Sequence, residues 1–315
     1  MFSIFNKKNH KIIYEIEHPY QYLKPIKLLE DNLDKLYWIY LSANPAAICL
    51  LEKYPHKINW KYLSKNHNAM HLLEQNKQKI YWDVLSENSS AIYLLKKNMQ
   101  NINWNVLCRN THPDAIPLIE SKGYFICPFY LSKNPNAIEL LKEQPQQINK
   151  TMISMNPNAV EFLKQNPKYI DFIGLSVNPS AIDILEQNQD KINWKVLSYN
   201  PAAMHLLEEN QDKINWQNLS ENPAVMELLE ENTDKINWHL LSGNPAAIYL
   251  LEANPEKVNF NYLSCNIAAF VLDYHKIKKR MDIIREDLCM ATLHPARFEY
   301  YLTAYGYNIL EDEYE

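Results

Sequence analysis

Apolar and polar positions repeat along this chain with a period of 22 residues. The first four tryptophans, Trp38, Trp60, Trp82 and Trp104, are spaced by this period. An aliphatic residue follows three positions later and an asparagine six positions later, and the fullest form of the unit reads W-x-x-L-S-x-N-P-x-A-I-x-L-L-E-x-N-x-D-K-I-N. Self-similarity at such a period indicates a repeat architecture, so the usual estimate of domain number from length does not apply.

The period continues where the tryptophan itself is replaced. One two-residue insertion, between Asn110 and Ala115, keeps the later units in register. The residues at the tryptophan position are Trp38, Trp60, Trp82, Trp104, Pro128, Lys150, Phe172, Trp194, Trp216, Trp238 and Phe260. The sequence therefore predicts about eleven units.

Each unit has the start and stop signals of two helices. Asn44 followed by Pro45 is typical of an N-cap and first helical residue, because the amide oxygen accepts an orphan backbone N–H and proline lacks that donor. The apolar residues of 47–51 recur at helical spacing and predict one buried face. An asparagine such as Asn76 is expected to end this helix in the left-handed conformation, in a chain with only 4 glycines. A second asparagine, such as Asn59, is expected to cap the shorter helix that carries the tryptophan.

One asparagine is invariant among the units, although an N-cap alone would also tolerate serine, threonine or aspartate. This predicts a stacked amide ladder in which each side chain also bonds the backbone of a neighbouring unit. The sharper alternative is a serial amide-binding surface, and the structural interpretation is favoured because buried polar groups find partners. The ladder residues are Asn44, Asn66, Asn88, Asn110, Asn134, Asn156, Asn178, Asn200, Asn222, Asn244 and Asn266.

A single 22-residue unit cannot bury enough apolar surface to offset the conformational entropy of ordering it, so the units must stack. The predicted fold class is all-α: an elongated α-solenoid of about eleven two-helix repeats over residues 38–272. The open ends of such an array need caps. We expect an N-terminal cap at 1–37, and capping helices with an acidic tail at 273–315.

Composition argues against several functional classes. A net charge of −5 disfavours a nucleic-acid binder, because phosphate neutralisation requires a basic excess. The five cysteines are scattered without a Cys-x-x-Cys pair, which favours free thiols in a reducing compartment; a Cys108–Cys127 disulfide is the weaker alternative. No secretion signal or membrane span is evident, so we expect a protein that is cytosolic or packaged in a particle.

Candidate chemistry is sparse, and no enzyme is predicted. His67 and His71 have a spacing that zinc can use, but no further ligand is nearby, so neither a metal site nor a cofactor is expected. No nucleophile with an adjacent base and no phosphate-binding loop can be recognised. The basic run 275–280 is offset by neighbouring acidic residues and is interpreted as a solvated helix face.

The run from Leu219 to Trp238 resembles the short-repeat proteins encoded by amoeba-infecting giant viruses, and the similarity extends over almost the whole chain. The C-terminal segment 293–308, with Leu293-His294-Pro295 and Tyr305-Gly306-Tyr307-Asn308, is similar to the ends of those proteins. The geometry is more loosely similar to leucine-rich-variant repeats, in which α-helices and short tight helices alternate. The first resemblance implies a viral origin and action in an infected cell or a virion, and it implies no activity.

Two functions remain: protein–protein scaffolding, with RNA binding as the alternative. RNA reading would need basic and stacking side chains at one position of every unit, and the position before the ladder asparagine carries no such pattern. Three consecutive units carry apolar residues there, with a second residue four positions earlier on the same helix face. The predicted partner-binding residues are Met155, Ile173, Val177, Lys195 and Tyr199, with Thr151 alongside. The competing interpretation is that the protein buries this stripe against its own neighbours.

Overall fold

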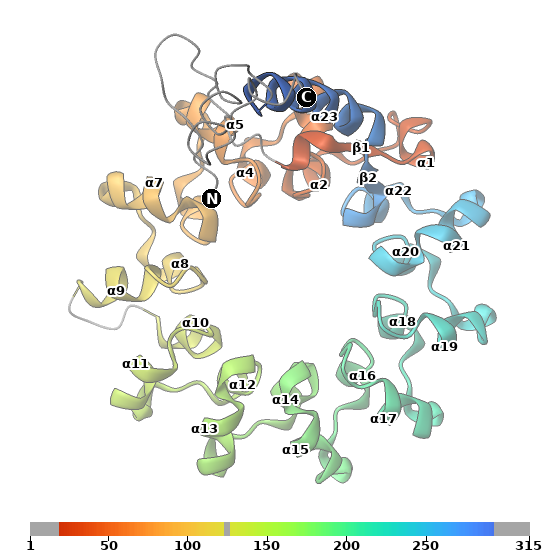
Figure 1. Cartoon of the computed structure of the whole chain (residues 1–315). Helices are drawn as coiled ribbons and strands as arrows, with labels where there is room; N and C mark the ends of the chain where they lie inside the picture. The colour runs from red at the N-terminus through yellow and green to blue at the C-terminus, as the bar shows by residue number, and fades with distance from the viewer. Residues whose placement is uncertain (1–18, 123–126, 293–315) are drawn as a thin grey trace, which may run out of the picture. The chain divides into compact units, whose positions relative to one another are not determined.

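The computed structural model describes residues 19–122 and 127–292, and it is mostly helical as the sequence predicts. Its contacts divide the chain into two units, one ending at Val271 and one beginning at Leu272. The first unit alternates short helices on the inner side with helices on the outer side (Figure 1). The second unit is described only over α23 (Tyr274–Thr292), so the sequence motif at 293–308 and the acidic tail lie outside the described residues.

The inner helices begin at the tryptophan position of each repeat. They are α2 (Trp38–Ala43), α4 (Trp60–Leu63), α6 (Trp82–Leu85), α8 (Trp104–Leu107), α10 (Pro128–Lys133), α12 (Lys150–Ser154), α14 (Phe172–Val177), α16 (Trp194–Leu197), α18 (Trp216–Leu219), α20 (Trp238–Leu241) and α22 (Phe260–Leu263).

The outer helices carry the L-L-E segment of each repeat. They are α1 (Lys27–Glu30), α3 (Ile48–Lys53), α5 (Met70–Gln75), α7 (Ile92–Lys97), α9 (Ala115–Glu120), α11 (Ile138–Glu143), α13 (Val160–Gln165), α15 (Ile182–Glu186), α17 (Met204–Glu209), α19 (Met226–Glu230) and α21 (Ile248–Ala253).

Short 3₁₀ turns connect these helices, and two strands, β1 (Leu23–Pro25) and β2 (Phe270–Leu272), pair in a small sheet. The turns are η1 (Pro19–Tyr22), η2 (Pro55–Lys57), η3 (Lys77–Lys79), η4 (Ser89–Ala91), η5 (Met99–Asn101), η6 (Pro145–Gln147), η7 (Pro157–Ala159), η8 (Pro167–Tyr169), η9 (Pro179–Ala181), η10 (Gln189–Lys191), η11 (Gln211–Lys213), η12 (Thr233–Lys235), η13 (Pro245–Ala247), η14 (Pro255–Lys257) and η15 (Ile267–Ala269).

Asparagines bond the ends of these helices. The asparagine after the outer helix does so in a different way from the prediction. Asn59 caps α4 as expected, because its Oδ1 accepts from the backbone N–H of Tyr62 at 3.1 Å. The prediction that Asn76 ends its helix in the left-handed conformation is wrong, since its φ is −130°. Its Nδ2 instead donates to the carbonyl of Leu72 at 2.9 Å, which satisfies one of the free carbonyls at the end of α5.

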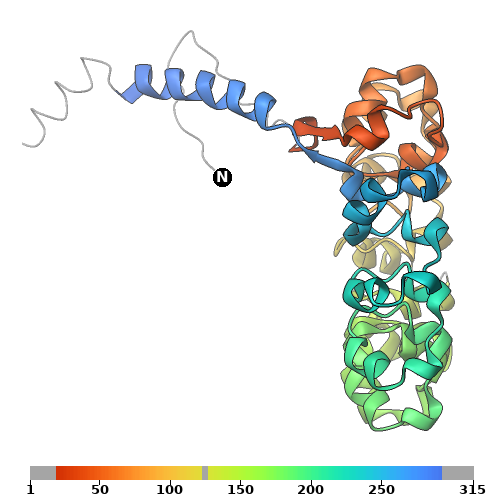
Figure 2. The same ribbon diagram turned by 90° about the vertical axis from the view of Figure 1, so that its right-hand side faces the viewer.

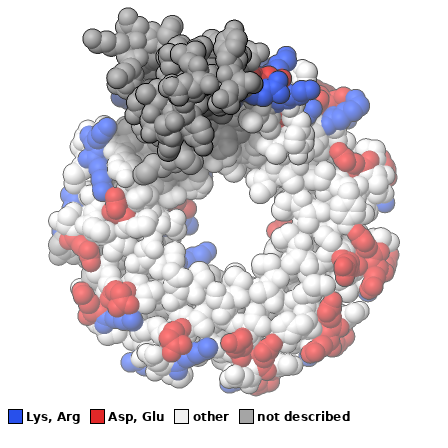
Figure 3. All heavy atoms as spheres, viewed as in Figure 1, with Lys and Arg blue, Asp and Glu red and all other residues white. Residues whose placement is uncertain are grey.

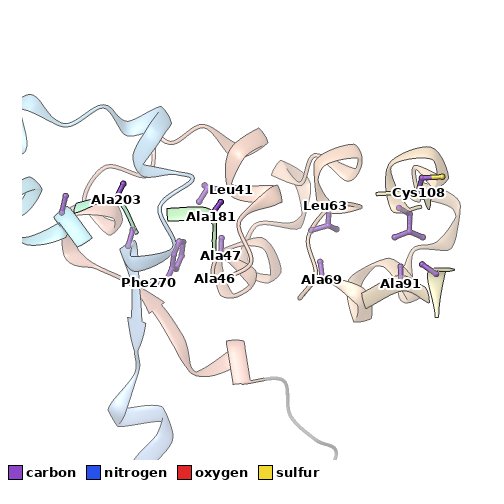
Figure 4. Packing of buried hydrophobic residues seen from close by; sticks show 14 of the residues in the cluster. Leu41, Ala46, Ala47, Leu63, Ala69, Ala91, Cys108, Ala181, Ala203 and Phe270 are labelled. Carbon is purple, nitrogen blue, oxygen red and sulfur yellow. The ribbon is translucent and has the colours of Figure 1, made fainter. Parts of the chain in front are cut away.

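The apolar face predicted for the outer helices is buried. Ala47 and Leu51 are fully buried and Ile48 nearly so, and the equivalent residues of the other repeats join them in one continuous cluster. Figure 4 shows this regularity in successive repeats, where Leu41 and Leu63 lie above the small residues Ala47 and Ala69. Because each repeat contributes one face to each neighbour, no repeat has a complete core by itself.

Residues 26–44 meet residues 264–269 within the first unit, so the repeats do not form the open, elongated array that the sequence analysis expects, whereas the predicted cap at 1–37 lies partly outside the described residues. Asn44 Nδ2 donates to the carbonyls of Ser264 at 3.1 Å and Asn266 at 3.2 Å. The backbone N–H of Tyr37 donates to Ser264 Oγ at 3.0 Å, and that of Ile26 to the carbonyl of Ala269 at 2.9 Å. The repeats of this unit therefore close into a ring (Figure 1), seen edge-on in Figure 2.

The closing repeat is shared between two distant segments, which we call the seam repeat: residues 260–269 supply its inner helix and 26–37 its outer helix. The segment from Ile26 to Lys35 has the same pattern as residues 48–57, including the L-L-E and the later lysine. This match was readable in the sequence but was missed, because the alignment began at the first tryptophan. Leu29 and Leu36 are buried, so residues 26–37 contribute to covering the last repeat, and the predicted C-terminal cap, described only as far as Thr292, stays a prediction.

Candidate interaction surface on the inner helices

The eleven predicted ladder asparagines lie between neighbouring repeats and are at most 3% exposed. Asn66 is representative: its Nδ2 donates to the carbonyls of Ser42 at 3.1 Å and Asn44 at 2.9 Å, and its Oδ1 accepts from the backbone N–H of Asn68. The bond from Nδ2 to the carbonyl at the serine position of the preceding repeat recurs in every repeat, including that of Asn200. Both ends of each amide are thus occupied within the ring, which argues against the serial amide-binding alternative.

The ladder passes through the insertion without a break. Asn134 reaches the carbonyls of Cys108 and Asn110 at 2.9 and 3.0 Å, although two additional residues separate them in sequence. The extra residues lie in the connection before α9, so the asparagines on either side of them keep their hydrogen bonds. The spacing between repeats is therefore set by the hydrogen bonds rather than by the number of residues in each repeat.

A serine ladder runs beside the asparagines. Ser42 Oγ donates to the carbonyl of Trp38 at 2.7 Å and accepts from the backbone N–H of Asn59, which caps the next inner helix α4, at 2.9 Å. Cys108 occupies the equivalent place in its repeat, where its Sγ lies 3.4 Å from the carbonyl of Trp104. The abundant serine of the repeat is therefore explained by backbone bonding between one inner helix and the cap of the next.

Six of the seven tryptophans have a lysine Nζ over the ring, supplied by the later part of the same repeat: Trp38, Trp60, Trp104, Trp194, Trp216 and Trp238. Lys213 Nζ lies 4.5 Å from the ring of Trp194, and Lys235 Nζ lies 4.2 Å from that of Trp216. At the seam, Lys35 Nζ lies 5.0 Å from the ring of Phe260. The lysine that recurs in the D-K-I-N segment was the available signal for this cation–π contact, which the sequence analysis missed.

The predicted partner-binding residues lie in three adjacent repeats, on or directly after the inner helices α12, α14 and α16. Ile173, Val177 and Tyr199 are 50%, 36% and 40% exposed, Lys195 is exposed and Met155 is half-buried. We call these five residues the interaction stripe. The competing interpretation is that the protein buries the apolar stripe against itself. The exposure of Ile173, Val177 and Tyr199 contradicts it for these three residues.

Close backbone packing holds the centre of the stripe. A Cβ added to Gly174 would lie 2.5 Å from the carbonyl oxygen of Thr151 and 2.7 Å from Ser154 Cβ. The missing side chain therefore lets α14 approach α12 more closely than any other residue would allow. Ile173 and Val177 flank this contact on a rigid backbone.

Tyr199 is partly shielded from solvent and lies near Glu221. Burial raises the pKa of Tyr199, and Glu221 and Tyr262 add to the effect. Burial also raises the pKa of Glu221. Figure 3 shows most charged side chains on the outer rim and a largely uncharged surface around the central opening.

The structure does not assemble the other candidate groups into sites. His71 Nε2 lies 2.9 Å from Glu52 Oε1, whereas His67 Nδ1 lies 3.3 Å from Ser89 Oγ. Within residues 19–122 and 127–292, no cluster of His, Cys, Asp or Glu could hold a metal ion.

Cys49, Cys108, Cys127 and Cys265 are free thiols. Burial, together with the nearby Cys127, raises the pKa of Cys108 to about 11. Since the thiolate is the reactive form, Cys108 is a poor nucleophile at neutral pH.

Comparison with protein-family models, curated proteins and solved structures finds no match to this chain. Among the described residues, no helix is long and apolar enough to cross a membrane.

Proposed function

We propose that this chain is a closed α-solenoid of eleven 22-residue repeats that acts as a non-enzymatic scaffold for protein–protein interaction. The asparagine bonds, which recur in every repeat and continue across the seam repeat, support the architecture. The resemblance to giant-virus repeat proteins extends the proposal to a role in an infected host cell or a virion.

The interaction stripe carries the proposal. Single exposed apolar side chains are common, but here Ile173 and Val177 on α14 are followed by Tyr199 in the next repeat and preceded by the half-buried Met155, and adjacent apolar residues of this kind are found in interfaces. Ile173, Val177 and Tyr199 provide an aliphatic floor beside an aromatic anchor, and Lys195 adds a polar edge. The partner would be a protein segment that lies along α12, α14 and α16.

Rigidity of the ring supports binding at this surface. The asparagine and serine bonds fix the inner helices relative to one another, and Gly174 adds a close contact between α12 and α14. A surface held in this way loses little conformational entropy when a partner binds. RNA binding is less well supported, because the inner helices do not repeat a basic and a stacking residue at one position.

A random peptide library displayed on phage and selected against the full chain tests this proposal. We expect enriched peptides with bulky apolar residues, whose binding is lost in the double variant Val177→Asp, Tyr199→Asp without a change in melting temperature. The matched control is Tyr93→Asp, because Tyr93 is 68% exposed on the outer helix α7 and should not affect binding. Unchanged binding in the double variant would refute the proposal, and a large loss of stability would show that these side chains belong to the core.

A further inference from the structure

A pocket of about 350 Å³ lies beside the interaction stripe, among the inner helices α8, α10 and α12 and the turns that follow them. Residues of four successive repeats line it, from the repeat of α6 to that of α12. Its main side chains are Glu87, Arg109, Phe129, Tyr130, Lys133 and Met152. Met152 belongs to the same helix as Ser154, directly before Met155, so the pocket and the stripe are neighbours on α12.

Arg109 is held in a defined orientation. Its Nη1 lies 3.3 Å from Glu87 Oε2, and its Cζ lies 4.5 Å from the centre of the Tyr130 ring. Stacking on an aromatic ring fixes the plane of a guanidinium and leaves its edge available for a planar acceptor. Glu87 also balances the charge of Arg109.

Lys133 leaves the pocket with a net positive charge. It is exposed at the end of α10, and no ion pair to it is found within the described part of the chain. Two cations and one carboxylate line the pocket, so its formal charge is +1. One additional monoanion would neutralise it.

An apolar side completes the pocket. Phe129 is 45% exposed and packs edge-on against Tyr130, with their ring centres 5.3 Å apart. Met152 lines the pocket next to these rings and supplies an adaptable thioether. The pocket thus combines one unbalanced cation with an aromatic and aliphatic surface.

We propose that this pocket binds a carboxylate side chain of the partner protein, together with a bulky apolar residue next to it. Arg109 and Lys133 bind the carboxylate, and Phe129 and Met152 contact the apolar side chain. The partner segment then continues along the interaction stripe, so the inference rests on the proposed scaffold function. A single carboxylate fits better than a nucleic-acid backbone, because Glu87 would repel a second negative charge.

Synthetic peptides test the pocket directly by isothermal titration with the full chain. The probe is acetyl-Ala-Leu-Asp-Phe-Leu-Ala-amide, with matched peptides in which Asn or Lys replaces Asp. We expect the Asp peptide to bind about tenfold more tightly than the Asn peptide, which corresponds to one favourable charged contact. Equal affinity for the Asp and Asn peptides would overturn the proposal.

Charge reversal separates recognition from a structural effect. The variant Lys133→Glu should lose affinity for the Asp peptide by about tenfold and gain affinity for the Lys peptide. Phe129→Ala should weaken binding of both the Asp peptide and the Asn peptide, and it should preserve the preference for Asp. A Lys133→Glu variant that folds normally and keeps the original preference would also overturn the proposal.

The outcomes distinguish this inference from the scaffold function. If library peptides bind through the stripe but the titrations show no preference for Asp, the pocket assignment fails and the scaffold remains. If the Asp peptide binds but Val177→Asp, Tyr199→Asp leaves library selection unchanged, the stripe fails. Tighter binding of an oligouridylate, lost in Lys133→Glu, would assign the pocket to RNA and overturn the carboxylate proposal.

Discussion

The seam repeat and the continuous repeat 216–237 make the same contacts from different chain connectivity. In the continuous repeat, one segment supplies both α18 and α19. In the seam repeat, α22 and α1 come from opposite ends of the ring, yet Tyr37 bonds Ser264 as Asn237 bonds Ser220. The comparison shows that the repeat is defined by its interactions with neighbours, and that a covalent link between its two helices is not required to form them.

The two repeats should nevertheless differ in stability against local opening. Separating the helices of the seam repeat breaks contacts on one side and frees a whole chain end, whereas the helices of 216–237 remain tethered on both sides. Tethering limits the entropy that a segment gains when it detaches. The seam is therefore expected to be the first place at which the ring opens.

Removing the N-terminal half of the seam repeat should have the largest effect. A chain that begins at Trp38 lacks Leu29 and Leu36, and exposes the apolar face of the last repeat that they cover. We expect aggregation, or a melting temperature lower by about 10 °C or more, measured by circular dichroism.

The control for this truncation is a chain that ends at Leu272. It retains the seam repeat and should keep its melting temperature within a few degrees. If the C-terminal truncation is instead the more damaging one, the C-terminal segment caps the array and the closed ring is wrong.

Substituting a ladder asparagine at the seam and another within the continuous chain tests whether the ring is closed in solution. Asn44→Ala removes two bonds across the seam, and Asn222→Ala removes the equivalent two within continuous chain. Each should lower the free energy of unfolding by about 1–3 kcal/mol, because buried carbonyls lose their donors. Urea denaturation measures both values.

Serine substitutions provide the matched control, since Asn44→Ser and Asn222→Ser retain an acceptor for the backbone N–H in the turn that follows but lose the donors. Similar losses in the free energy of unfolding at Asn44 and Asn222 would indicate a closed ring. A cost at Asn44 well below that at Asn222 would mean that the carbonyls of Ser264 and Asn266 are hydrated and that the seam is open.

Hydrogen exchange should detect local opening of the seam without mutation. The N–H groups of Tyr37 and Asn237 donate to Ser264 and Ser220 at 3.0 and 2.9 Å, so they are equivalent bonds in different contexts. We expect about tenfold lower protection at Tyr37, because the seam can open without global unfolding. Equal protection, measured by NMR, would show that the ring unfolds as one cooperative unit.

The lysine contacts should give the smallest difference. Lys35→Met and Lys257→Met keep an aliphatic chain but remove the charge from Phe260 and Trp238, respectively. We expect a loss of about 0.5–1 kcal/mol at Lys257 and less at Lys35, because tryptophan binds cations better than phenylalanine. A larger loss at Lys35 would assign that lysine a further role in closing the seam.

The local structure of each repeat was determined by the sequence. The period of 22, the cap at Asn59, and the buried face of residues 47–51 follow from helical spacing and hydrogen-bonding capacity, which act over a few residues. The predicted cap at Asn44 is wrong in its position, because α3 begins at Ile48 and Asn44 Oδ1 accepts from the backbone N–H of Ala46 in the turn before it. The same reasoning led from the invariant asparagine to a side chain that must donate and accept at once. The conformation of Asn76 was not determined in this way, because its amide bonds its own helix and needs no left-handed backbone.

Only the tertiary structure decided that the array closes. Curvature arises from small rotations between neighbouring repeats, which accumulate around the ring and leave no signature in any single repeat. The meeting of 26–37 with 260–269, and the gathering of Arg109, Phe129 and Lys133 into one pocket, depend on that accumulated geometry. Sequence patterns specify what each residue can bond, whereas the superhelical path decides which distant residues come within reach.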